Sequence, residues 1–300
     1  MTNPPKKKPR GKQGKKQQAA KSGLALVHSV ADSGSTHARR GRAADLRSRF
    51  LALIDEGPSP LERAQDMIYD AWEACDARKR LALARKALAI SADCADAYVL
   101  LAEETDDDTE ARRLLEQGVA AGERALGEEF FQENAGDFWG ILETRPYMRA
   151  RQALAQILWD EGERDAAVGH YQELLRLNPN DNQGIRDLVV PCLLELGREK
   201  EAASILDAYA MDGAAWMSFS RALLAFRRGG DCAKSRRLLR TALRCNPHVR
   251  SYLLGRRRPP RFVPDYYTPG EESEAICYVM NGAKSWASVP GAIAWLADFE

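Results

Sequence analysis

Residues 154–181 read LAQILWDEGERDAAVGHYQELLRLNPND, and apolar residues recur there at the intervals of three and four that are typical of helices. Gly162 divides the stretch and Pro179 closes it, and both residue types commonly end helices. The residues expected to pack two helices together are Leu154, Ala155, Leu158, Ala167, Tyr171 and Leu174. The stretch therefore predicts a helix, a tight turn and a second, antiparallel helix.

The 34 residues from Met148 to Asp181 have the spacing of a tetratricopeptide repeat. Adding 35 to the key positions reproduces the pattern at Val189, Leu193, Gly197, Ala202 and Leu206. A more degenerate copy precedes them, with Ala84, Ala87 and Leu88 closing one helix pair and Tyr98, Leu101 and Ala102 opening the next. The clearest repeats are 148–181, 182–215 and 216–248. We predict an all-α, tetratricopeptide-type α-solenoid of stacked antiparallel helix pairs, with pairs from about residue 60 to 247.

The charge of the chain is divided unevenly along its length. Residues 1–42 hold eleven Lys or Arg and one acidic residue, Asp32, so they carry +10, and the net charge of +1 leaves −9 on the rest. With few large apolar residues, 1–42 is predicted to be a disordered basic N-terminal arm preceding a helical repeat domain over 43–300. A first helix is expected over 43–54, and Ser59-Pro60 is expected to start the next one.

Two segments interrupt the repeats. Residues 127–147 are rich in aromatic residues, and 255–267 are rich in proline and arginine and lead to a C-terminal helical cap over 265–300. We predict that both help to define partner specificity, with Arg256, Arg257 and Tyr266 as contact residues, because arginine and tyrosine are frequent in binding hot spots. The alternative is structural: the aromatic residues cap a repeat edge and the prolines hold the last helices in place.

Three strings, CADAYVLLAEE, NPHVRSYLL and GEESEAICYVMNGAKSWASVPGAIAWL, resemble the suppression-of-tumorigenicity-seven family over roughly residues 71–300. The resemblance implies a helical repeat body. It implies no catalytic residues, because none are agreed for this family. Family members in animals carry membrane-spanning segments ahead of this region, where this chain has its basic arm. We therefore do not expect a membrane role to carry over.

Composition points to a cytoplasmic protein. No window approaches the roughly 18 apolar residues of a membrane span, and the first apolar stretch, 24–30, is too short for a signal-peptide core. The cysteines form no CxxC pair, so we expect small buried helix residues in a reducing compartment.

Residue patterns typical of catalysis are missing from the sequence. No two histidines have HxxxH or HExxH spacing, and His170 is expected at an exposed or seam position, while His248 is expected to cap helix ends. The run Asp106-Asp107-Asp108-Thr109 is predicted to start a helix rather than to bind a cation. Phosphate-binding glycine loops are absent. We predict a non-enzyme without cofactor or metal.

Binding another protein is the favoured function, because stacked helix pairs present their first helices along an extended concave groove that suits a peptide or helix. The groove candidates lie off the packing positions of the best repeat: Arg149, Gln152, Gln156 and Trp159. The alternative is that Trp159 packs on the neighbouring repeat and that the other three are solvated.

Nucleic-acid association through the basic arm is the second hypothesis. Its candidate phosphate contacts are Lys6, Lys7, Lys8, Arg10, Lys12, Lys15 and Lys16. The arm has no aromatic residue to stack on a base, so a solubilising or unstructured tail is its alternative.

Overall fold

The computed structural model describes residues 57–264 and 266–299. The predicted basic arm and the predicted helix over 43–54 lie outside this part. Within it all regular secondary structure is helical, which confirms the all-α prediction. The helices are α3 (Pro60–Glu73), α4 (Ala77–Ile90), α5 (Ala95–Glu104), α6 (Asp108–Leu126), α7 (Glu128–Asn134), α8 (Arg145–Glu161), α9 (Arg164–Leu177), α10 (Ile185–Glu195), α11 (Glu199–Ala208), α12 (Ala215–Gly229), α13 (Ala233–Cys245), α14 (Val249–Leu253), α15 (Glu272–Ala287) and α16 (Ala292–Asp298), with 3-10 turns at Phe138–Gly140 and Leu142–Thr144.

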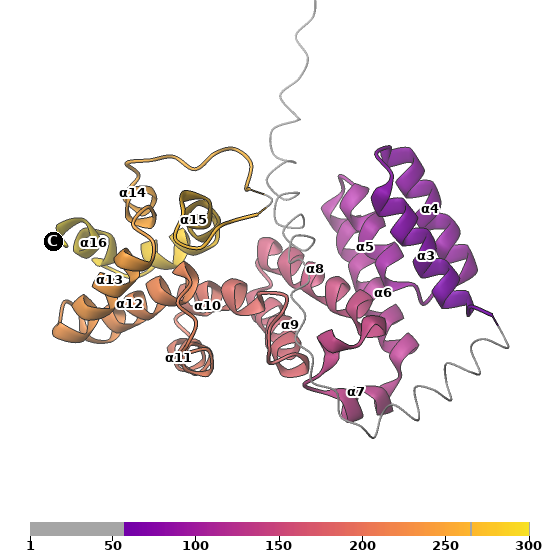
Figure 1. The fold of residues 1–300 in the computed structure, drawn as a ribbon, viewed down its shortest axis with the longest axis horizontal. Coiled ribbons are helices and arrows are strands. Elements are labelled where there is room, and N and C mark those ends of the chain that lie inside the picture. The colour runs from indigo at the N-terminus through magenta and orange to yellow at the C-terminus, as the bar shows by residue number, and fades with distance from the viewer. Residues whose placement is uncertain (1–56, 265, 300) are drawn as a thin grey trace, which may run out of the picture.

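Figure 1 shows the helices arranged from α3 at one end of the molecule to α16 at the other. Consecutive helices pack as pairs: α3 with α4, α5 with α6, α8 with α9, α10 with α11, and α12 with α13. We call α3, α5, α8, α10 and α12 the first helices, and the side of the array that they form the first-helix face. Pairs stacked in this way confirm the predicted α-solenoid.

Two helix starts follow directly from the sequence. The hydroxyl of Ser59 accepts from Glu62 N at 3.2 Å while the Glu62 side chain accepts from Ser59 N at 2.7 Å, and Pro60 occupies the first turn. The Asp107 carboxylate accepts a hydrogen bond from Thr109 N at 3.0 Å. The acidic run is therefore a helix cap, as predicted.

The predicted helix, turn and helix of the best repeat are present as α8 and α9. Gly162 ends α8 with φ of 92°, a left-handed conformation that favours glycine, and Gly197 does the same after α10 with φ of 73°. Ala155 and Ala167 are fully buried where α8 and α9 meet. The burial of both alanines agrees with the repeat spacing, which predicted small residues where the two helices pack.

This packing gives a stability prediction with a neighbouring control. Ala167→Trp is expected to lower the free energy of unfolding by about 1–3 kcal/mol, because an indole at this closed contact forces the helices apart. Ala166→Trp, at the exposed neighbouring position, should change it by less than about 0.5 kcal/mol. Chemical denaturation measures both, and equal midpoints for the two variants would contradict the register.

The aromatic insert folds back onto the repeats. Phe138 and Tyr147 are buried and pack edge to face, with ring centroids 6.4 Å apart, while Phe131 contacts Tyr147 at 5.0 Å. A Cβ at Gly122 of α6 would lie only 2.7 Å from the Tyr147 Cβ, so a glycine is needed for this close approach. These contacts give the insert a structural role, whereas its predicted part in specificity stays a prediction.

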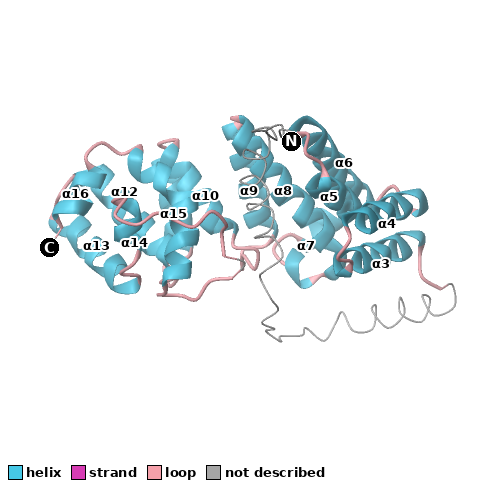
Figure 2. Ribbon diagram, turned by 90° about the horizontal axis from the view of Figure 1, so that it is seen from above, coloured by secondary structure: helices cyan, strands magenta, loops and turns pink. Residues whose placement is uncertain are grey.

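The C-terminal segment contains one element that the sequence reading missed. The short α14 lies between the last predicted repeat, 216–248, and the predicted linker, 255–267, and the predicted final helix pair follows as α15 and α16. α15 packs against α10, α12 and α14 rather than extending the array as a further repeat (Figure 2). Among residues 57–264 and 266–299, no helix is both long and apolar enough to pass through a bilayer.

The cysteine prediction is partly wrong. Cys192 and Cys277 are buried helical residues as expected, but Cys75 is exposed after α3 and Cys94 precedes α5. Cys232 and Cys245 are only half-buried.

Candidate functional site

The first-helix face is divided into a covered and an uncovered part. Over α10 and α12 it is covered by α15 of the same chain. In the described part of the chain the main packing partners of α3, α5 and α8 are the neighbouring helices of the array and the 3-10 turn at Leu142–Thr144. The first helices α10 and α12 therefore do not line an open groove, and α3, α5 and α8 form the candidate face.

Glu274 anchors α15 in its position. It is fully buried, and its carboxylate accepts hydrogen bonds from Ala215 N and Asn246 Nδ2 at 2.9 Å each and from Gly270 N at 2.7 Å. Ala215 N belongs to the first turn of α12, where a helix lacks internal acceptors. A single carboxylate thus links the starts of α12 and α15 to the end of α13.

Arg149 is the centre of the candidate face, in a role that the sequence reading missed. Its Nε donates to Asp96 Oδ1 at 2.8 Å and its Nη2 donates to Asp96 Oδ2, while Gln65 Nε2 donates to the same carboxylate at 2.8 Å. Asp96 is fully buried, and the guanidinium lies 5.2 Å from the centre of the Trp72 ring. These contacts join α3, α5 and α8.

The other groove candidates are less accessible than predicted. Gln152 and Trp159 are only 6% and 8% exposed, so their predicted position on an open surface is wrong. Gln152 accepts from Gln183 Nε2 at 2.9 Å, and the Trp159 ring lies 4.0 Å from the Arg164 guanidinium carbon. Only Gln156 is partly exposed as predicted, and it accepts from the Tyr171 hydroxyl at 3.4 Å. Apolar spacing did not reveal that polar residues of this face connect neighbouring helices.

Glu103 is the unusual group of this face. It lies two turns after Asp96 on α5 and is partly buried, yet within the described residues it makes no hydrogen bond or ion pair. Burial, reinforced by the charge of Asp96, raises the pKa of Glu103 to about 7. Its neighbour Glu104 is paired instead, accepting from Arg80 Nε at 2.6 Å.

A pH-dependent stability difference follows from Glu103. Because its folded-state pKa is raised above the unfolded value, its contribution to stability is complete below about pH 4 and is lost as pH rises through about 7. Glu103→Gln is uncharged throughout, so it should stabilise the protein by about 1–2 kcal/mol at pH 8 and by little at pH 5. Glu104→Gln, which breaks a pair, should not stabilise at either pH. Urea titrations at pH 5 and pH 8 measure the free energy of unfolding of each variant. A change on Glu103→Gln that is the same at both pH values would contradict the prediction.

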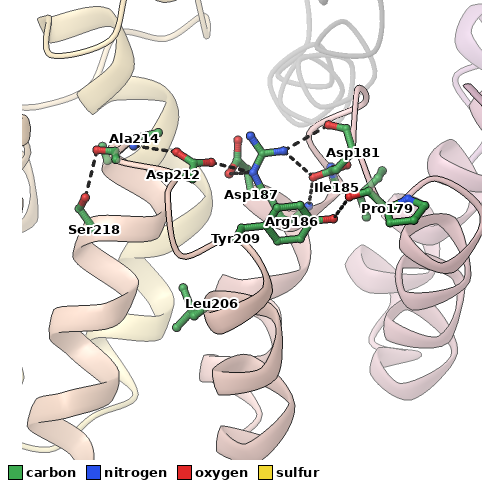
Figure 3. Close-up of polar contacts among 12 residues, drawn as sticks. Pro179, Asp181, Ile185, Arg186, Asp187, Leu206, Tyr209, Asp212, Ala214 and Ser218 are labelled. Atoms are coloured by element: carbon green, nitrogen blue, oxygen red, sulfur yellow. Dashed lines mark hydrogen bonds and ion pairs between the residues drawn. The ribbon is translucent and has the colours of Figure 1, made fainter. Parts of the chain in front are cut away.

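A second polar cluster holds the loop between α9 and α10 in place (Figure 3). Arg186 donates from Nε to Asp212 Oδ2 at 2.7 Å and from Nη1 to Asp181 Oδ2 at 2.9 Å. Asp181, at a positive φ of 49°, also accepts from Ile185 N at 2.7 Å and so caps α10. Burial raises the pKa of the neighbouring Asp187 to about 8. Both Nε and Nη1 of Arg186 are bound within the chain, so we assign this cluster to structure.

The predicted linker contacts are on the surface, away from the first-helix face of α3, α5 and α8. Tyr266 is 79% exposed, Arg256 is exposed, and Arg257 pairs with Glu272. The adjacent Tyr267 packs on Trp216, with ring centroids 5.0 Å apart, which holds the linker against α12. Whether Arg256, Arg257 and Tyr266 contact a partner stays a prediction.

In the described part of the chain no three His, Cys, Asp or Glu residues are placed to hold an ion. His170 is partly buried as a seam residue, and burial lowers its pKa to about 4. His248 stands at the start of α14 without a side-chain capping bond. The seven candidate nucleic-acid residues of the arm, Lys6 to Lys16, lie outside the described residues.

Comparison with known proteins gives one family. The family model described as ST7 protein matches residues 42–298. A protein ST7 homolog from Caenorhabditis elegans is 27% identical over 292 residues, covering 85% of this chain and 53% of its own length. The suppressor of tumorigenicity 7 protein-like of Homo sapiens is also 27% identical, over 78% of this chain and 44% of its own. The chain thus spans about half the length of the curated relatives it matches.

Proposed function

We propose a function for this chain, which belongs to the ST7 protein family: it is a non-catalytic scaffold that binds a peptide or helix of another protein along the first-helix face of α3, α5 and α8. The observation that carries the proposal is α15, a helix lying on the equivalent face of α10 and α12. The chain's own fold thus supports the idea that this kind of surface accommodates a helix.

The composition of the face agrees with a binding role. Tyr69 is 48% exposed beside the partly buried Trp72, with ring centroids 5.8 Å apart, so an aromatic contact area is available next to the Arg149 cluster. Aromatic residues supply much of the energy of protein interfaces. The rigid cluster beneath them would reduce the ordering cost of binding.

Quantitative capture of partners tests this proposal against the linker alternative. Tagged full chains carrying Tyr69→Ala or Tyr266→Ala are compared with the original and with Met211→Ala, a control that is 97% exposed between α11 and α12. Tyr69→Ala should reduce recovery of specific partners about tenfold or more with an unchanged melting temperature. Loss with Tyr266→Ala alone would move the site to the linker, and full recovery with Tyr69→Ala would reject the proposed face.

A further inference from the structure

The candidate face carries carboxylates without neutralising partners. Asp66, Tyr69 and Glu73 follow one another at intervals of three and four on α3, so they share an exposed side of that helix. Within the described residues, Asp66 and Glu73 make no ion pair, and neither does Glu103 on the adjoining α5. Two unpaired acids thus flank the exposed Tyr69 on α3, and a third lies on the adjoining α5.

Two of the basic residues near these acids are already engaged. Arg149 gives two donors to Asp96, and Arg80 binds Glu104 through both Nε and Nη2, at 2.6 and 2.5 Å. Neither guanidinium is left to neutralise the remaining carboxylates. The face is therefore complementary to a positively charged segment.

The chain itself contains such a segment. Residues 6–21 read KKKPRGKQGKKQQAAK and include eight Lys or Arg and no acid. The 38 residues between Lys21 and Pro60 can span up to about 125 Å, far more than the roughly 21 Å length of the 14-residue α3. A tethered segment meets the face at an effective concentration up to the millimolar range, which favours it over an equally charged segment of another molecule.

We propose that residues 6–21 bind in cis to the face formed by Asp66, Tyr69, Glu73 and Glu103, and that a partner must displace them. Lys and Arg side chains face the three carboxylates, and the aromatic ring of Tyr69 lies among them as a surface for a cation. The inference that the arm docks in cis rests only on the opposite charges of residues 6–21 and of the face. Only the competition with a partner rests on the proposed function.

A spin label at Cys75 tests the docking in the full-length chain. Cys75 is exposed two residues after Glu73, and no cysteine occurs in residues 1–74. Labelling is limited to one equivalent and mapped to Cys75 by mass spectrometry, and attenuation of arm amide signals is read by NMR. Docking predicts stronger attenuation for residues 6–21 than for 22–42, the reverse of the order set by distance along the chain.

Matched charge variants show whether the acids are responsible. Changing Asp66, Glu73 and Glu103 together to their amides should abolish the reversed order, as should about 1 M NaCl, where charges are screened beyond about 3 Å. Glu128, Glu129 and Asp165 lie outside the face, and changing them to amides removes three carboxylates as well and should leave the order intact. Melting curves verify that both variants are folded.

Several results would overturn the inference. One is attenuation that falls steadily from residue 42 towards residue 6, and another is a reversed order that survives the triple face variant. Attenuation found only when spin-labelled chains are mixed with separate isotope-labelled chains would assign the arm to a second copy and reject docking in cis. If the arm does not dock while Tyr69→Ala still loses partners, the proposed function survives and this inference fails.

Discussion

Replacing Arg149 with alanine is expected to lower the free energy of unfolding by about 3–5 kcal/mol, because it leaves the fully buried Asp96 without its cation. Gln65 alone would then remain on that carboxylate. Urea or guanidinium denaturation measures the change. Loss of the link between α3, α5 and α8 should also increase hydrogen exchange in these helices.

Two controls distinguish the effect of breaking a buried ion pair from the effect of removing any arginine side chain. Arg176→Ala removes a guanidinium of which 54% is exposed and which pairs with Glu173, so it should cost no more than about 1 kcal/mol. The double variant Asp96→Asn, Arg149→Met should recover much of the loss, since no unpaired charge remains. Equal midpoints for Arg149→Ala and Arg176→Ala would contradict the central role of the cluster.

The helix pairs could be predicted from sequence because their signals are local. The turns after α8 and α10 need the left-handed conformation of Gly162 and Gly197. The packing of α9 needs a small residue at the buried Ala167. Each of these requirements involves only one helix pair. The capping box at Ser59 spans four residues. Such patterns remain visible in a single sequence.

The candidate face could not be predicted because its contacts are distant in sequence. Arg149 meets Asp96 across 53 positions, and both look like ordinary helical charges when each is read alone. A signal was available in Asp96, an acid between Ala95 and Ala97 that precedes the apolar stretch of α5. Polar groups in such surroundings need a partner, which would have directed attention to this helix.

The covering of α10 and α12 by α15 was hidden for the same reason. Glu274 stands in the first turn of α15, where acids are common on exposed helix ends. Its burial depends on Ala215 and Asn246, which lie 59 and 28 positions earlier. Periodicity identified α15 as a helix but could not show what it packs against.

Glu274→Ala is expected to destabilise the C-terminal half by about 3–5 kcal/mol, since it removes the acceptor of three buried or partly buried N–H donors at once. The donors on Ala215 and Asn246 would lose their partner in an interior that water does not reach. Glu272→Ala, which removes a half-exposed acid two residues earlier, should cost about 1 kcal/mol or less.

Hydrogen exchange followed along the chain shows where this loss falls. If Glu274 holds α15 on α10 and α12, protection should fall in α15 and α16 before it falls in α3 to α9, because the latter pack without it. Opening of α15 would also expose apolar residues of α10 and α12, and binding of a hydrophobic dye should increase under the same conditions. Uniform loss of protection along the chain, or unchanged protection in α15, would contradict the role of Glu274 as the anchor of a helix bound to its own repeats.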